Sequence, residues 1–313
     1  MRKDTLPEAM LIGREGAAFD DGDYIYEFKF DGVRCLALLD PAGKTLLINK
    51  RQINVTPTYP ELRDINKQVK KSCLLDGEAV IFVNNRPDFS AIQRRSLMSD
   101  KVKIAIAADL SPVTFVAFDI LSLEAADLTQ LPLIQRKAIL SENTMPGGRL
   151  MISEYIEREG KRLFEISEKN ALEGIVAKRK ASLYFPGRRT KDWIKIKNLQ
   201  DDDFIICGYI PKEGAAISLI LAQYVSSRLT YMDHVALGRF SGDFRLLKEM
   251  PKTEASPLKY VPKGNENALW LEHYAVGKVS FMERSPSGKM RQGVFRGIRE
   301  DKAPGECVFS PTE

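Results

Sequence analysis

Aromatic and charged residues alternate along the first well-defined run of the chain. From residue 23 to residue 30, aromatic residues occupy every second position, and Glu27 and Lys29 fall on the opposite side. Because the side chains of a strand alternate between its two faces, this run predicts a β-strand. Similar runs predict further strands over residues 33–39, 45–48, 74–83, 113–121, 174–180 and 192–198.

Helical spacing of apolar residues appears in three other segments, which predict helices over residues 89–97, 133–143 and 160–170. A fourth helix is predicted from Pro60, because proline suits the first helical position and Leu62, Ile65 and Val69 then form an apolar stripe. Helices and strands follow one another without the regular alternation of a parallel sheet. The pattern therefore predicts a mixed α+β domain.

The pattern changes after the acidic stretch from Asp201 to Asp203. Short strands are predicted over residues 204–210, 216–224, 229–239 and 275–283, with a single helix over residues 243–250. Several short strands with one helix are typical of a small β-barrel such as an OB-fold. We therefore predict two domains, residues 1–200 and residues 201–313, and an overall α+β fold.

Composition narrows the class of protein without identifying it. The 313 residues include 44% hydrophobic and 28% charged residues, which is ordinary for a globular protein. A net charge of +5 and a pI near 8.9 permit nucleic-acid binding but do not require it. The chain has no apolar run that could span a membrane and no apolar leader, so a cytoplasmic protein is expected. Four scattered cysteines and two histidines make a zinc site an unfavourable interpretation.

The most informative residue is Lys29, in the sequence Lys29-Phe30-Asp31-Gly32-Val33-Arg34. Lysine is a poor nucleophile at neutral pH, because its pKa is about 10.4 unless nearby cations or burial lower it. Arg34 and a bound metal would both add positive charge. A lysine in this setting can attack a phosphoryl group and form a phosphoramide. An isolated lysine at a strand end is more often an ordinary surface residue.

Polar residues recur on one face of other predicted strands. Asp76 and Glu78 are two residues apart, and Glu173 opens a later strand, so these carboxylates are candidates for metal binding. Lys195 and Lys197 project together and are suited to holding a phosphate, although two such lysines can also form a solvated basic face. Phe118 is a candidate for stacking on a base, although a lone phenylalanine is more often part of a core.

Taken together, these clusters resemble the nucleotidyltransferase motifs of ATP-dependent DNA ligases over about residues 20–305. The matching segments, in order, are Lys29 to Arg34, Arg51, Asp76-Gly77-Glu78, Phe118-Asp119, Glu173-Gly174-Ile175-Val176, Trp193-Ile194-Lys195-Ile196-Lys197 and Arg299-Glu300-Asp301-Lys302. The resemblance implies a nucleotidyltransferase (adenylation) domain of mixed, largely antiparallel sheets with helices, followed by an OB-fold domain.

The resemblance also implies a three-step reaction with ATP and Mg²⁺ or Mn²⁺. Lys29 would become covalently attached to AMP, the AMP would pass to a 5′-phosphate, and a 3′-OH would then seal the nick. The remaining roles follow residue by residue: Glu27, Arg34, Arg51, Glu78, Phe118, Lys195 and Lys197 for the nucleotide, Glu78 and Glu173 for the metal, and Arg299, Asp301 and Lys302 for orienting pyrophosphate. The stretch from Asp201 to Asp203 is expected to act as the hinge for this last group.

The final segment of the chain is most similar to the ligase domains of prokaryotic end-joining ligases. This implies nicked or broken double-stranded DNA as substrate, Ku as a candidate partner, association with the nucleoid and a monomeric enzyme. No additional N-terminal DNA-binding domain is expected before Lys29. The alternatives are an RNA ligase, a GTP-dependent mRNA-capping guanylyltransferase and, from a different class, a non-catalytic nucleic-acid-binding module.

Overall fold

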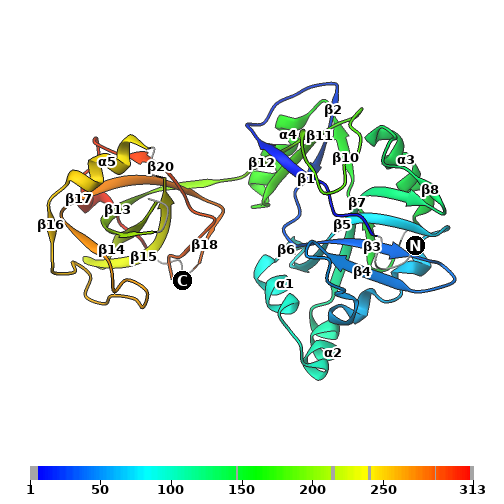
Figure 1. The fold of residues 1–313 in the computed structure, drawn as a ribbon, viewed down its shortest axis with the longest axis horizontal. Helices are drawn as coiled ribbons and strands as arrows, with labels where there is room; N and C mark the ends of the chain where they lie inside the picture. The colour runs from blue at the N-terminus through cyan, green and yellow to red at the C-terminus, as the bar shows by residue number, and fades with distance from the viewer. Residues whose placement is uncertain (1–5, 146, 213–215, 239–240, 286, 311–313) are drawn as a thin grey trace. The chain divides into compact units, whose positions relative to one another are not determined.

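The computed structural model describes residues 6–145, 147–212, 216–238, 241–285 and 287–310 (Figure 1). The chain divides into two compact units, Met1–Asn198 and Leu199–Glu313. Within the described ranges, the first unit combines largely antiparallel sheets with several helices and the second combines antiparallel strands with one α-helix, so the predicted α+β class is confirmed. In the described residues, no helix is long and apolar enough to cross a membrane.

The first unit contains a seven-stranded sheet, in which long apolar strands occupy the centre. Its main path runs β4 (Thr45–Asn49), β3 (Val33–Leu39), β5 (Cys73–Val83), β7 (Val113–Leu123) and β8 (Ala126–Asp127), while β6 (Arg86–Pro87) pairs with β5 and β9 (Leu150–Ile152) pairs with β7. All of these pairs are antiparallel except that of β7 and β9. β5 and β7 carry Glu78 and Phe118 on this sheet.

A second, five-stranded sheet completes the first unit. Its order is β1 (Leu11–Glu15), β12 (Arg189–Lys197), β11 (Gly174–Arg179), β2 (Tyr24–Phe28) and β10 (Tyr155–Glu157). Along β12, Ile194 and Ile196 pack in one buried cluster and Trp193 in another, so the predicted alternation of faces is confirmed. β2 leads directly into Lys29, and β11 follows directly after Glu173.

Three helices of this unit match the predicted segments: α1 (Phe89–Ser96), α3 (Leu133–Asn143) and α4 (Gly160–Lys169). A further helix, α2 (Lys101–Leu110), was not predicted, because only Ile104 of its residues is buried and the helix has no clear apolar stripe toward the core. Asp100 nevertheless caps it by accepting hydrogen bonds from two backbone N–H groups of its first turn.

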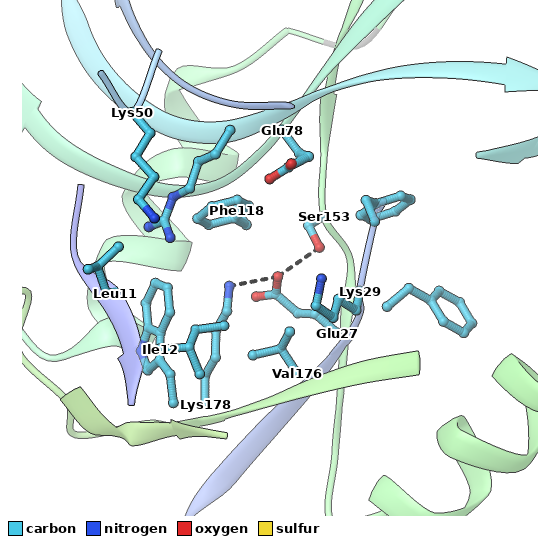
Figure 2. A pocket seen from close by; sticks show the side chains of 14 residues that line it. Leu11, Ile12, Glu27, Lys29, Lys50, Glu78, Phe118, Ser153, Val176 and Lys178 are labelled. Atoms are coloured by element: carbon cyan, nitrogen blue, oxygen red, sulfur yellow. Dashed lines mark hydrogen bonds and ion pairs between the residues drawn. The ribbon is translucent and has the colours of Figure 1, made fainter. Parts of the chain in front are cut away.

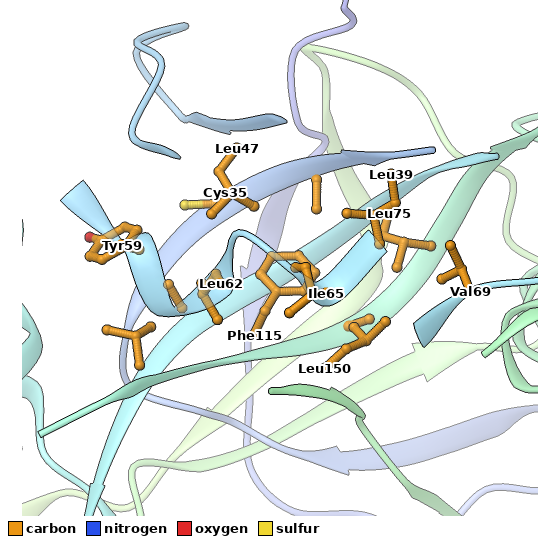
Figure 3. Close-up of a cluster of buried hydrophobic side chains, with 14 of the residues drawn as sticks. Cys35, Leu39, Leu47, Tyr59, Leu62, Ile65, Val69, Leu75, Phe115 and Leu150 are labelled. Carbon is orange, nitrogen blue, oxygen red and sulfur yellow. The ribbon is translucent and has the colours of Figure 1, made fainter. Parts of the chain in front are cut away.

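The predicted helix from Pro60 is wrong. The segment forms two short 3₁₀ turns, Pro60–Leu62 and Ile65–Gln68. Its apolar stripe is real, because Leu62, Ile65 and Val69 are all buried in the main hydrophobic cluster (Figure 3). A spacing of three residues suits a 3₁₀ turn as well as an α-helix, and neither turn has a side-chain cap at its start. The pattern therefore identified the buried side chains but not the type of turn.

The second unit is a small β-barrel with one helix. Its elements are β13 (Gln200–Pro211), β14 (Ile217–Val225), β15 (Arg228–Leu237), α5 (Gly242–Glu249), β16 (Lys252–Thr253), β17 (Leu269–Phe281), the hairpin of β18 (Glu283–Arg284) and β19 (Met290–Arg291), and β20 (Val294–Ile298). β17 pairs with both β13 and β20, and β20 also lies against β15. Arg239, the predicted end of one strand, lies outside the described residues.

The acidic stretch from Asp201 to Asp203 differs from the sequence-based expectation of a hinge. All three residues belong to β13 and pair in register with Ser280, Val279 and Lys278 of β17. A strand with a paired neighbour cannot absorb a large change in backbone dihedral angles without losing its ladder hydrogen bonds. These aspartates therefore form part of the rigid barrel.

Candidate active site

A pocket in the first unit is lined by residues from both of its sheets (Figure 2). Five of the predicted site residues line it: Glu27, Lys29, Arg34, Glu78 and Phe118. The remaining lining residues are Leu11, Ile12, Phe28, Phe30, Lys50, Ser153, Val176, Lys178 and Trp193. Apolar and aromatic walls with a few converging charges are typical of a site for a small ligand.

Lys29 and Glu173 meet where two neighbouring inner strands of the five-stranded sheet, β2 and β11, end and begin. The Lys29 ammonium lies 2.5 Å from the Glu173 carboxylate, and the Lys29 backbone N–H donates to the carbonyl of Gly174. Gly174 has a φ of +135°, and a Cβ atom there would lie 2.1 Å from the Ile196 carbonyl oxygen. Only glycine permits this close approach, which brings β11, β12 and the proposed nucleophile together.

Glu78 faces the same region from the seven-stranded sheet. Burial raises the pKa of its carboxyl to about 8, against the opposing influence of the cations Lys29 and Arg34. The neighbouring carboxylates Asp76 and Glu173 raise it further. A carboxyl in this condition is poised to lose its proton when a cation arrives near neutral pH.

Arg34 is held by a bidentate ion pair. Its Nε and Nη2 atoms donate to the two oxygens of Asp76 at 2.9 and 2.6 Å, and the hydroxyl of Tyr184 donates to the same carboxylate at 2.7 Å. The guanidinium also lies 5.2 Å from the centre of the Phe118 ring. Arg34 therefore lines the pocket, but Asp76 already compensates its charge, so it contributes less to the activation of Lys29 than its closeness in sequence suggests.

Glu27 belongs to a buried network that sequence reasoning found only in part. Lys178 lies 2.9 Å from its carboxylate, and Ser153 donates a hydrogen bond to it at 2.7 Å (Figure 2). Lys137 lies 3.0 Å from the same carboxylate. Burial alone would raise the pKa of Glu27, but the two ammonium groups bring it below its ordinary value. One carboxylate shared by two lysines leaves this wall of the pocket positively charged.

Lys178 was not among the predicted site residues. Its ammonium lies 4.4 Å from the ring centres of both Phe118 and Trp193, and burial lowers its pKa although Glu27 opposes the shift. The sequence did contain a signal for Lys178. It follows the apolar run from Ile175 to Ala177, and an ionisable side chain buried at the end of such a run needs a charged partner.

Lys195 and Lys197 lie on β12 beside this pocket but do not line it. Lys195 pairs with Glu15 at 3.2 Å. Partial burial and the nearby Lys195 lower the pKa of Lys197, which also interacts electrostatically with Glu173 and Lys29. Lys197 therefore places positive charge next to the candidate nucleophile, and Lys195 adds to it through Lys197.

Arg51 is not part of the pocket lining. It lies in the exposed turn after β4, where its backbone N–H donates to the side chain of Asn49. The preceding residue, Lys50, lines the pocket instead. Neighbouring residues of a turn can point in different directions, and the loose match of this motif could not resolve which of the two faces the pocket.

The three C-terminal candidates, Arg299, Asp301 and Lys302, are clustered in the second unit. Arg299 donates from Nε and Nη2 to the oxygens of Asp301 at 2.7 and 2.8 Å. The hydrogen bond from Arg299 lowers the pKa of the Asp301 carboxyl to about 2. Arg299 and Lys302 also both contact Asp203, at 3.3 and 2.8 Å.

The residues around Lys29 fit a divalent cation of the magnesium type. In the described part of the chain, no three histidine, cysteine or carboxylate side chains cluster as a complete metal cage. Glu78 and Glu173 nevertheless provide two interacting carboxylates. Magnesium is commonly held by one or two carboxylates together with substrate phosphates, so this incomplete donor set matches its preferences.

The family model "ATP dependent DNA ligase domain" matches residues 14–197, and "ATP dependent DNA ligase C terminal region" matches residues 212–302. The multifunctional non-homologous end joining protein LigD of Mycolicibacterium smegmatis is 30% identical over 98% of this chain and 41% of its own length. The corresponding protein of Mycobacterium tuberculosis is 30% identical over 97% of this chain and 40% of its own length.

A solved structure of mycobacterial DNA ligase D complexed with ATP and MES covers 99% of this chain and 100% of that chain, with 28% identity and a TM-score of 0.57. The chain thus spans about two fifths of the length of these LigD relatives and corresponds to their ligase domain. The predicted resemblance and the predicted combination of an adenylation domain with an OB-fold are confirmed. The first family model alone matches more than half of the chain, so this protein belongs to the ATP-dependent DNA ligase family.

Proposed function

We propose that this chain seals nicks in double-stranded DNA by way of a lysyl-AMP intermediate. The observation that carries the proposal is the meeting of Lys29 and Glu173 beside a pocket with an aromatic wall. The Nζ atom of Lys29 attacks the α-phosphorus of ATP, the bond to pyrophosphate breaks, and the amine loses a proton. The AMP then passes to the 5′-phosphate of the nick, and attack by the 3′-OH forms the phosphodiester and releases AMP.

The pocket offers a chemically selective place for adenine. Phe118 supplies a flat apolar surface for the base, and Lys178 and Glu27 provide a donor and an acceptor in the same wall. The carboxylate of Glu27 can accept from the amino group of adenine but meets a carbonyl oxygen in guanine. This difference supports ATP rather than GTP as the nucleotide.

The phosphates are proposed to lie among the surrounding cations. Lys50 at the pocket and Lys195 and Lys197 beside Lys29 neutralise the triphosphate and hold its α-phosphate in line for attack. Arg34 contributes at the wall of the pocket, and Arg51 is left for the nick phosphate. Arg299 and Lys302, with Asp301 fixing the guanidinium of Arg299, orient the leaving pyrophosphate.

Glu78 and Glu173 are the proposed ligands of a divalent cation, Mg²⁺ or Mn²⁺. When bound, the cation neutralises phosphate charge in the transition state. Because Glu173 also forms the ion pair with Lys29, a cation held by Glu173 would compete with the Lys29 ammonium for this carboxylate. Glu78, whose carboxyl has its pKa raised to about 8, would hold the cation in its ionised form.

The first test is the intact mass of the protein after bound AMP has been stripped with pyrophosphate and ATP or GTP has been supplied with Mg²⁺. Addition of one AMP with ATP alone, followed by sealing of a nicked duplex, supports the proposal. Addition of GMP would indicate a capping enzyme, and preferential joining of RNA would indicate an RNA ligase. A folded protein that forms no adduct but binds DNA would be a binding module.

We further propose that the chain acts at double-strand breaks together with Ku, as a nucleoid-associated monomer. The support is the likeness over nearly the whole chain to proteins named for non-homologous end joining. Joining of two linear duplexes should be stimulated by purified Ku from the same organism, and nicks with a 3′-ribonucleotide should be sealed differently from nicks with a 3′-deoxynucleotide. Sealing that ignores both Ku and the 3′ sugar would overturn this part of the proposal and leave the ligase reaction standing.

A further inference from the structure

We propose that Asp203 is a positioning residue for adenylation, which holds Arg299 and Lys302 in one fixed arrangement for binding pyrophosphate. The inference rests on the proposed function, because it concerns the same two cations. It assigns a role to the acidic stretch that sequence reasoning interpreted as a hinge.

The geometry around Asp203 joins the two cations through a single carboxylate. Lys302 Nζ lies 2.8 Å from Asp203 Oδ2, and Arg299 Nη1 lies 3.3 Å from Asp203 Oδ1. The other two nitrogens of the Arg299 guanidinium are engaged by Asp301. Every nitrogen of the guanidinium therefore contacts a carboxylate, and these contacts with Asp301 and Asp203 fix the orientation of the guanidinium plane.

The carboxylate of Asp203 is itself firmly held. Asp203 is only 8% exposed, lies within β13 and pairs in register with Lys278 of β17. Its carbonyl oxygen accepts a hydrogen bond from the side chain of Gln223, which is fully buried. The backbone N–H of Arg299 donates to the carbonyl of Val276, also on β17. The carboxylate and the backbone of the arginine are therefore fixed on the same rigid ladder.

Asp201 and Asp202, the other two aspartates of the stretch, are occupied by different partners. Asp201 pairs with Lys278 at 3.2 Å and accepts a hydrogen bond from Ser280. Asp202 pairs with Arg284 at 3.1 Å. Among the described residues of this stretch, Asp203 alone forms an ion pair with Arg299 or Lys302, so Asp201 and Asp202 are natural controls.

By holding Arg299 and Lys302 together, Asp203 would pre-organise the two cations for binding pyrophosphate. Pyrophosphate carries several negative oxygens close together, and two cations tethered to one carboxylate are already close to each other. Free lysine and arginine side chains each lose considerable rotamer entropy on binding, and a rigid anchor removes part of that loss in advance. The partial exposure of both cations, 33% for the Arg299 side chain and 25% for that of Lys302, leaves them accessible to an anion.

The test separates the chemical steps. Asp203→Asn should slow transfer of AMP from ATP to Lys29 by about tenfold, the scale of a lost charge-assisted hydrogen bond, and raise the KM for ATP. Sealing of a nick that already carries AMP on its 5′-phosphate should stay near the wild-type rate. Asp203→Glu should recover most of the adenylation rate, because it keeps the charge. Asp201→Asn, the matched control on the same strand, should adenylate normally.

The outcomes distinguish this inference from the proposed function. If Arg299→Ala loses adenylation but Asp203→Asn does not, the positioning role is overturned and the proposed role of Arg299 remains. If Arg299→Ala adenylates normally, the proposed role of Arg299 in orienting pyrophosphate is overturned, and the role of Asp203 that rests on it falls with it. Faster adenylation in Asp203→Asn would mean that the ion pairs restrain the cations rather than position them. Equal loss of lysine adenylation and of sealing of a pre-adenylated nick, with a lowered melting temperature, would mean that Asp203 has only a structural role.

Discussion

The Lys29 ammonium and the Glu173 carboxylate lie 2.5 Å apart, although 144 positions separate the two residues in the chain. β2 ends immediately before Lys29 and β11 begins immediately after Glu173, and these strands are neighbours in one sheet. The side chain of the proposed nucleophile, Lys29, therefore forms an ion pair with Glu173. A cation held by Glu173 would compete with Lys29 for the carboxylate, which would link the proposed chemistry of Lys29 to cation binding.

Replacing Lys29 tests the nucleophile directly. Lys29→Ala and Lys29→Arg should both abolish the addition of AMP seen by intact mass, because neither side chain offers an amine that can form the phosphoramide. Lys29→Arg is the sharper variant, since it keeps a cation beside Glu173 and should retain the wild-type melting temperature. An AMP adduct on either variant would show that another residue is the nucleophile.

Glu78 should make stability depend on pH. Its folded pKa of about 8 lies above its ordinary value of 4.5, so the folded protein binds more protons than the unfolded chain between these limits. The free energy of unfolding contributed by Glu78 is therefore fully present below the lower value and decreases as the pH rises through the window. Glu78→Gln lacks this loss, so its melting temperature relative to wild type should increase from about pH 5 to about pH 8. A difference that stays constant with pH would contradict the raised pKa.

Glu27 should be important for stability as well as for nucleotide binding. It is 1% exposed and compensates the buried ammonium groups of Lys137 and Lys178. Glu27→Ala leaves both lysines without their carboxylate and should lower the free energy of unfolding by about 3 kcal/mol or more. Glu159→Ala, which removes an exposed pair with Arg162, is the control and should cost less than about 0.5 kcal/mol in chemical denaturation.

Gly77 separates Asp76 from Glu78 on β5, and a side chain has no room there. A Cβ atom would lie 2.5 Å from the Phe115 ring and 2.6 Å from the Val116 carbonyl oxygen. Gly77→Ala should therefore destabilise the first unit by about 1–3 kcal/mol and lower the affinity for ATP by displacing its neighbours. Gly22→Ala, where nothing lies within 4 Å, should leave both quantities unchanged. Normal stability of Gly77→Ala would mean that the sheet relaxes at this point.

Substitutions of Lys50 and Arg51 are expected to differ in their effect on the KM for ATP. Lys50 lines the pocket and Arg51 is exposed in the adjoining turn. Lys50→Ala should raise the KM for ATP in the adenylation step by about tenfold, the effect of one lost phosphate contact. Arg51→Ala should leave that value close to wild type and act, if at all, on nick sealing. The reverse result would restore the prediction made from the motif.

Local periodicity in the sequence was enough to show which residues share one face of a strand or turn. The alternation of β2 and β12, the face shared by Lys195 and Lys197, and the burial of Leu62, Ile65 and Val69 all follow from local periodicity, which a strand or turn preserves whatever it packs against. The order of the motifs identified the family. Helix α2 and the turn type after Pro60 were missed or wrong, because local pattern carries little information about exposed helices and about the choice between 3₁₀ and α turns.

The ion-pair partners of the charged residues depended on the tertiary structure. The pairing of Lys29 with Glu173, of Arg34 with Asp76, of Lys178 with Glu27 and of Asp203 with Arg299 and Lys302 joins residues distant in the chain. Burial and ionic neighbours set the charge state of each group, and both depend on which strands become adjacent. Periodicity specifies the face on which a side chain lies, whereas sheet order and register specify what it meets there.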